Sequence, residues 1–244
     1  MKRAIVLAIS VLLTLIVALP MAFAQGGQGA KASGKAAELA VAWTKWAYSK
    51  PVAKSPLIGS YEGGPKCDGS PLSPTQGKTW FLAGTPDGSV VKRTCTVPVG
   101  TKLFFPVVSA TFFITEPEET KQIARDYVKD FIKAVLEDPE LSIKVKVDGK
   151  EINSNRMVRA KTPFFKVTFP KNNIFAECCG VEAGKYQTIS NGLWVTLPPL
   201  SKGEHTIKFK LNAPNVDLDP NTAGLEGFSQ NNTYHLTVVN SRQQ

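Results

Sequence analysis

Histidine is scarce in this chain of 244 residues, which contains only His205 and His235. The sequence also lacks the G-x-S-x-G string that presents a catalytic serine. Its nearest string, Thr188 to Gly192, has no first glycine and precedes a strand-like segment. His205 shares the strand parity of Ile207, so we expect it to point inward and to contact a backbone group. Hydrolysis by a serine–histidine pair is therefore disfavoured.

Long apolar runs are missing after the first two dozen residues. At the start of the chain, Lys2 and Arg3 precede an apolar stretch over residues 5–19, and Ala22-Phe23-Ala24 forms a small-x-small cleavage site. This order is typical of a secretory signal peptide, here predicted over residues 1–24. The apolar stretch is short for a retained anchor. We therefore expect a secreted protein, extracellular or periplasmic, with no transmembrane segment after cleavage.

Acidic residues are in the minority. Removing the predicted signal peptide takes away Lys2 and Arg3, which leaves 27 basic residues against 20 acidic ones and a net charge of +7. A basic exported protein tends to meet anionic surfaces. We therefore expect a glycan or another anionic cell-envelope polymer as partner, and no nucleic acid.

The four cysteines lack the C-x-x-C spacing and the nearby histidine of a zinc site. In an exported protein they favour disulfides, and four cysteines allow three pairings. We favour a bond between Cys67 and Cys95, because a strand and turns between them bring the two ends together. Cys178 and Cys179 then have three alternatives: a bond to each other, a bond to a partner chain, or cross-links to the first pair.

The amino-terminal half predicts two helices. Gln, Gly, Ala, Lys and Ser dominate residues 25–34, which we expect to form a flexible leader. A helix near residues 35–49 follows, capped by Ser33, with Trp43 and Trp46 on one stripe. That stripe favours a buried face over a sugar platform. A second helix is predicted near residues 116–137, where a capping box starts at Thr115.

Most of the remaining sequence alternates between apolar and polar residues with the period of a β-strand, in about eight segments. The segment over residues 103–108 is apolar on both faces, as a covered central strand would be. We therefore predict a mainly β fold: an antiparallel β-sandwich of jelly-roll type with two flanking or inserted α-helices. One domain over residues 35–240 is expected, and a split near Asp138 is the alternative.

A block of uncommon residues runs through the first half of the chain: Trp43-Thr44-Lys45-Trp46, Cys67, Gln76-Gly77, Trp80-Phe81-Leu82-Ala83-Gly84-Thr85, Arg93-Thr94-Cys95-Thr96-Val97-Pro98 and Phe105-Pro106. It resembles a family of uncharacterised small secreted microbial proteins with a W-x-x-W helix and a C…GQ-x-G-x-WFLAGT…R-x-C-x-VP block. The resemblance implies export and a disulfide between Cys67 and Cys95. It brings no catalytic residues, and Cys178 and Cys179 lie outside its pattern.

Five lysines and a tryptophan are the candidate ligand-binding residues, because they have the outward parity of several strands: Lys144, Lys146, Lys166, Lys208, Lys210 and Trp194. In a shared sheet they would form a basic face with one aromatic ring, which suits an anionic polymer by charge and by stacking. The alternative interpretation is that the lysines protect strand edges from aggregation.

Asp217, Asp219 and Asn221 place oxygen-bearing side chains at alternate positions, as the start of a calcium loop does. Thr222 stands where that loop needs glycine, and Phe228 stands where it needs glutamate. An ordinary turn is therefore favoured over a calcium site. We expect no other cofactor.

Taken together, the sequence favours a secreted, disulfide-braced, non-enzymatic binding or surface-associated protein that contacts a glycan or another anionic envelope polymer. A secreted hydrolase acting on polysaccharide or ester polymers is the alternative, because two loop carboxylates suffice for glycoside cleavage. A third alternative is an interaction protein that bonds to another chain through Cys178 or Cys179.

Overall fold

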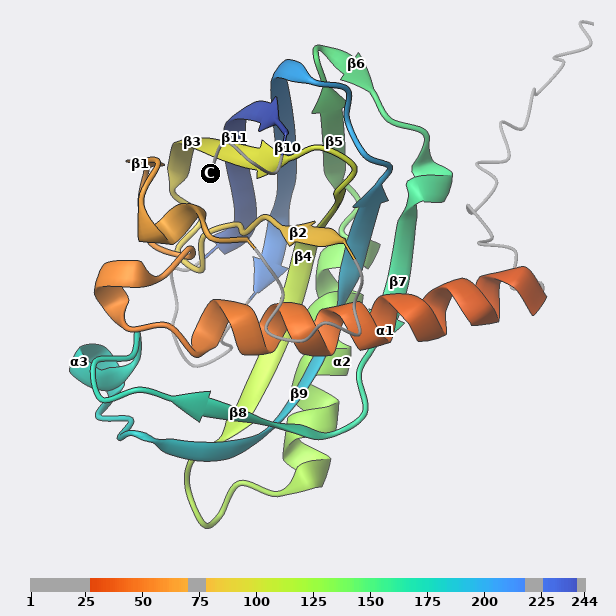
Figure 1. Cartoon of the computed structure of the whole chain (residues 1–244). Coiled ribbons are helices and arrows are strands. Elements are labelled where there is room, and N and C mark those ends of the chain that lie inside the picture. Colours follow the sequence, from red (N-terminus) through yellow and green to blue (C-terminus); the bar gives the residue numbers. More distant parts are fainter. Residues whose placement is uncertain (1–26, 70–77, 218–225, 241–244) are drawn as a thin grey trace, which may run out of the picture.

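The computed structural model describes residues 27–69, 78–217 and 226–240 (Figure 1). The predicted signal peptide therefore lies outside the described residues. The helices are α1 (Gly27–Tyr48), α2 (Lys121–Glu137) and α3 (Ala176–Cys179). The strands are β1 (Tyr61–Glu62), β2 (Thr79–Phe81), β3 (Val90–Pro98), β4 (Lys102–Ile114), β5 (Ser142–Val147), β6 (Lys150–Glu151), β7 (Met157–Lys161), β8 (Phe165–Phe169), β9 (Gly184–Leu197), β10 (Gly203–Asp217) and β11 (Glu226–Val239). None of these helices is long and apolar enough to cross a membrane.

The strands form two sheets, which confirms the predicted β-sandwich with flanking helices. Sheet A has the strand order β1-β3-β11-β10-β5-β6, and sheet B has the order β2-β4-β9-β7, with β8 also paired to β9. Three pairs are parallel: β1 with β3, β3 with β11, and β2 with β4. The other pairs among the described strands are antiparallel, so the sheets are mixed, and the predicted antiparallel sandwich is corrected at these three pairs. Strands far apart in the sequence need no tight hairpin, so nothing local forces them to run in opposite directions.

The expected alternative of a split near Asp138 does not fit the strand pairing. β9 follows Asp138 and pairs with β4, which precedes it, and β11 pairs with β3 in the same way. Both sheets therefore contain strands from both sides. Asp138 itself ties the two halves together, because its carboxylate accepts the backbone N–H of Asn215 at 2.7 Å.

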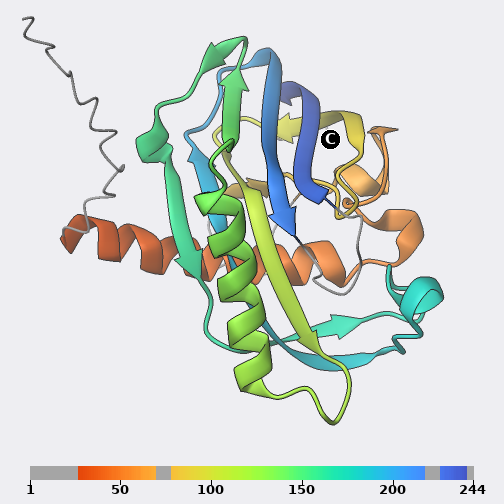
Figure 2. The same cartoon turned by 180° about the vertical axis from the view of Figure 1, so that it is seen from behind.

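The two helices cover opposite faces of sheet B. α1 crosses its outer face (Figure 1), while α2 lies on the inner face beside β4, below β5 and β10 in the reverse view (Figure 2). Four side chains of α2 are buried there: Ala124, Val128, Ile132 and Val135. α2 therefore extends the layer that sheet A begins, and the inner face of sheet B is covered along its length.

Helix α1 has the predicted buried tryptophan stripe, but it begins within the segment that was predicted to be a flexible leader. Trp43 and Trp46 are buried against sheet B, and the Trp43 indole N–H donates to the Leu82 carbonyl at 2.8 Å. The helix begins at Gly27, so the predicted flexible leader was wrong over residues 27–34. Ser33 is not a cap but lies within the helix, where its hydroxyl donates to the Arg159 carbonyl at 3.0 Å. Within this segment, Ser33 thus ties the helix to β7.

Helix α2 begins later than predicted. Thr120 is its N-cap, and the Thr120 hydroxyl accepts the Ile123 N–H at 3.2 Å. The capping box expected at Thr115 was therefore wrong. Instead, the Glu119 carboxylate accepts the backbone N–H groups of Thr115 at 2.6 Å and Glu116 at 2.9 Å, which closes a turn before the helix.

Candidate functional site

The outer face of sheet A carries a cluster of lysines. β10 alternates buried Ile207 and Phe209 with exposed Lys208 and Lys210, because only one face of the sheet meets the core. On the neighbouring strand β5, Lys146 lies directly opposite Lys208, and Lys144 lies directly opposite Lys210. Strand register therefore brings four of the five predicted lysines into one compact group.

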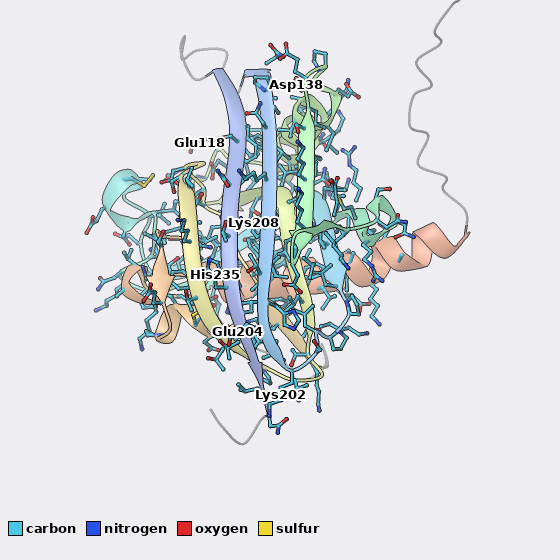
Figure 3. The ribbon with its side chains drawn as sticks, turned by 90° about the horizontal axis from the view of Figure 1, so that it is seen from above. Glu118, Asp138, Lys202, Glu204, Lys208 and His235 are labelled. Carbon is cyan, nitrogen blue, oxygen red and sulfur yellow. A yellow bond between two sulfur atoms is a disulfide. The ribbon has the colours of Figure 1, made fainter. Side chains whose placement is uncertain are left out.

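The group continues across β11 to β3. Thr233 lies between Lys208 and exposed Lys92, so one row of the sheet reads Lys92, Thr233, Lys208, Lys146. We call Lys92, Lys144, Lys146, Lys208 and Lys210 the lysine face. Figure 3 shows this side of the sheet, with Lys208, His235 and Glu204 labelled along its central strands. No signal in the sequence pointed to Lys92, because it joins the group through the parallel pairing of β3 with β11, which lies far along the chain.

The lysines of the lysine face form no close ion pairs with carboxylates of the described residues. Among residues 27–69, 78–217 and 226–240, none of the five lysines has an ion pair within 4.0 Å. The nearest acidic neighbour in register is Glu151, opposite Lys146 at the edge of the sheet. Like charges directly opposite each other on antiparallel strands are destabilising. The two lysine pairs therefore create a positive electrostatic potential at this surface, and a bound anion would reduce the repulsion between them.

Two predicted binding residues lie elsewhere, so this part of the prediction was wrong. Trp194 is 1% exposed and stacks on Phe104 with ring centroids 5.2 Å apart, because its face of sheet B is covered by α1. Its indole N–H donates to the Ala160 carbonyl at 3.3 Å. Lys166 is exposed but belongs to β8 of sheet B. Parity along one strand does not show which outward faces another element covers.

A serine, a histidine and an aspartate meet at one end of sheet A, which the sequence did not reveal. The Asp148 carboxylate lies 2.7 Å from His205 Nδ1, and the Ser201 hydroxyl lies 3.2 Å from His205 Nε2. The Asp148-Gly149 turn has positive φ at both residues and orients the carboxylate toward β10. There it also accepts the Thr206 N–H at 2.7 Å.

The contacts run from Ser201 through His205 to Asp148, as in a catalytic triad, but the hydrogen bonds of the His205 ring nitrogens differ from those of a triad histidine. The Ser201 carbonyl lies 3.0 Å from His205 Nε2, so both ring nitrogens face acceptors. The hydrogen bond to Asp148, together with the Ser201 carbonyl, raises the pKa of His205 against the opposing effect of burial. The pair favours an imidazolium that donates twice, whereas a general base needs a free ring nitrogen. The expected backbone contact of His205 is present, with a carboxylate in addition.

Arg93 of β3 forms a buried hydrogen-bond cluster between the two sheets, which we call the buried clasp. Its side chain is fully buried and donates from Nη1 to the Ala83 carbonyl at 2.5 Å and to the Tyr234 hydroxyl at 2.8 Å, and from Nε to the Gly59 carbonyl at 3.1 Å. The guanidinium lies over the Tyr61 ring at 4.9 Å and over the Tyr234 ring at 5.5 Å. No carboxylate within the described ranges forms an ion pair with it. This cluster is satisfied by carbonyls and ring faces, and it positions strands rather than a ligand.

The cysteines form two disulfides. Cys67 and Cys95 are bonded with their Cα atoms 5.4 Å apart, which confirms the predicted pair, and Cys178 is bonded to its neighbour Cys179. Within the described ranges no three His, Cys, Asp or Glu side chains gather to hold a metal ion. Of the weak calcium candidates, Asp219 and Asn221 lie outside the described residues, and Asp217 is the last residue of β10.

Comparisons with known proteins add little to this picture. No family model matches the chain, and no curated protein matches it. The solution structure of amebosin matches 65% of this chain and 96% of its own length, with 11% sequence identity and a TM-score of 0.20. A likeness of that size carries no argument about fold or function.

Proposed function

We propose that this protein is an exported, non-enzymatic binding or surface-associated protein that contacts an anionic polymer, such as an acidic glycan of the cell envelope, through the lysine face. The observation that carries the proposal is the register of β5 and β10, which sets Lys146 against Lys208 and Lys144 against Lys210. Among the described residues these four lysines form no ion pair within 4.0 Å, and the one carboxylate in register with them is that of Glu151, opposite Lys146. A bound anion would offset their mutual repulsion.

The spacing of the lysine face favours a polymer over a small anion. Neighbouring strands lie about 4.8 Å apart, and residues two apart on a strand lie roughly 7 Å apart. Lys208, Lys146, Lys210 and Lys144 therefore occupy the corners of a small grid, and Lys92 extends one row of it across β11. A chain with repeated carboxylates, sulfates or phosphates can contact several corners at once. Each further contact then adds affinity without a new association step.

The hydrolase alternative has one observation in its favour, the Ser201–His205–Asp148 arrangement. Its geometry places the Ser201 carbonyl beside the ring nitrogen that a general base would need free. A histidine that donates from both nitrogens holds the Asp148 turn against the loop before β10, which is a structural role. The binding function is therefore the stronger proposal.

The binding test uses the mature chain from Gln25, mixed with insoluble acidic and neutral polysaccharides and with cell envelopes at several salt concentrations. The test variant replaces Lys144, Lys146, Lys208 and Lys210 by glutamine. The matched control makes the same change at four exposed lysines in sheet B and in the loop after β8: Lys161, Lys166, Lys171 and Lys185. Both variants lose the same net charge.

We expect the wild type and the control variant to leave the supernatant with acidic material, less so at high salt, while the lysine-face variant stays in solution. Equal binding by both variants would show that only net charge matters and would overturn the assignment of the face. Soluble product released by the wild type, but not by a Ser201→Ala variant, would instead support the hydrolase.

A further inference from the structure

The Cys178–Cys179 disulfide lies at an exposed tip between β8 and β9. Both cysteines are exposed, as are Glu177 and Gly180 on either side of them. The other disulfide is less accessible: Cys95 is 3% exposed and belongs to the core between the sheets, and Cys67 is half-buried against that core. A thiolate can reach a disulfide sulfur only where that sulfur is accessible. Access therefore distinguishes the two bonds.

The two disulfides also differ in spacing, because Cys178 and Cys179 are adjacent in the sequence. One peptide bond holds their Cα atoms 3.8 Å apart, whereas ordinary disulfides join Cα atoms about 4.4–6.8 Å apart. A bond made outside that range is easier to reduce. Cys67 and Cys95, at 5.4 Å, lie within the ordinary range.

The tip that carries the exposed disulfide is held by contacts that do not involve it. Asn173 is 1% exposed; its amide donates to the carbonyls of Pro170 at 3.1 Å and Val181 at 2.9 Å and accepts the Phe175 N–H at 2.9 Å. The Phe175 ring stacks on Tyr48 of α1 with centroids 5.9 Å apart. The disulfide is therefore not needed to close this loop, and opening it would leave the fold in place.

We propose that Cys178–Cys179 is a thiol-exchange site, through which the protein joins covalently to a thiol-bearing molecule outside the cell. An incoming thiolate attacks one sulfur; a mixed disulfide forms, the Cys178–Cys179 bond breaks, and the other cysteine leaves as a thiolate that takes up a proton. No oxidant is consumed in this step. A second thiol would release the first as a disulfide and leave both cysteines reduced. The site is independent of the lysine face.

The test incubates the mature chain with glutathione at graded ratios of reduced to oxidised form. The reaction is quenched with acid, free thiols are alkylated, and the four cysteines are read by peptide mass. We expect Cys178–Cys179 to open at least about tenfold faster than Cys67–Cys95, given its exposure and spacing. Both bonds opening at the same rate, or Cys67–Cys95 opening first, would overturn the proposal.

Variants separate exchange from a structural role. In Cys178→Ser the remaining thiol has no neighbour to displace a bound glutathione, so the adduct should accumulate beyond its level in the wild type. In the double variant Cys178→Ser, Cys179→Ser no adduct should form, while the melting temperature should stay that of the wild type. A large loss of stability in the double variant would show that the bond is a structural brace. Binding to anionic polymer should be unchanged in both variants, so the two proposals fail separately.

Discussion

Replacing Arg93 by methionine tests the buried clasp between the sheets. Methionine keeps much of the apolar length of the side chain but removes all five N–H donors. The carbonyls of Gly59 and Gly84 then lose the donor that Arg93 supplies, and Ala83 keeps only the Tyr234 hydroxyl. Each buried acceptor left unpaired costs about 1–3 kcal/mol, and the contacts of the guanidinium with two tyrosine rings are lost as well. We expect the free energy of unfolding to fall by about 3–5 kcal/mol.

The assay is urea unfolding at neutral pH, followed by tryptophan fluorescence, because Trp43, Trp46 and Trp194 are all buried. The matched control is Lys92→Met, the outward neighbour on the same strand, whose effect should stay within about 0.5 kcal/mol. An Arg93→Met protein as stable as the wild type would refute the reasoning. It would mean that the free energy lost in desolvating the guanidinium equals the free energy gained from its hydrogen bonds and ring contacts.

Three further predictions concern the pair at the end of sheet A, the α1 interface and the α2 cap. The hydrogen bond to Asp148 raises the pKa of His205, so its stabilisation is full below about pH 6.5 and is lost as the pH rises through the folded value. The pKa of Asp148 is lowered by its bonds to Thr206 and His205 despite its burial, so its contribution is lost only as the pH falls below about 4. The stability gap between wild type and His205→Gln should thus be larger near pH 5 than at pH 9; a gap independent of pH would contradict the pairing. Trp194→Ala should lower the free energy of unfolding by about 3–5 kcal/mol, because the ring is buried under α1. Polymer binding by the folded variant should be unchanged. Weakened binding would show that Trp194 belongs to the binding site. Thr120→Ala should lower the free energy of unfolding by about 0.5–2 kcal/mol through the lost N-cap. An unchanged midpoint of urea unfolding would contradict the N-cap role of Thr120.

The structure gives a physical role to part of the block of uncommon residues in the first half of the chain. Arg93 comes from its R-x-C-x-VP segment, and the Ala83 and Gly84 carbonyls that Arg93 contacts come from its WFLAGT segment. Cys95, two residues after Arg93, bonds to Cys67. These uncommon residues therefore contact one another to hold β3 against the end of β2. Their order in the sequence reflects packing between the sheets rather than chemistry at a surface.

Local patterns in the sequence determined much of this protein. Alternation along β5 and β10 predicted which side of each strand carries Lys144, Lys146, Lys208 and Lys210, because successive side chains of a strand point to opposite faces. Helical spacing predicted the buried tryptophan stripe of α1. Both patterns arise from the geometry of one element, so a single stretch of sequence contains them.

Only the tertiary structure decided what each outward face meets. Trp194 and Lys208 both point away from the core between the sheets, yet α1 covers the first and nothing described covers the second. The contact of His205 with Asp148 joins residues 57 positions apart, and that of Arg93 with Tyr234 joins residues 141 positions apart. Such neighbours depend on strand order and on where the helices dock. Both follow from the packing of the whole chain, because the free energy of burial depends on total area and not on position in the sequence.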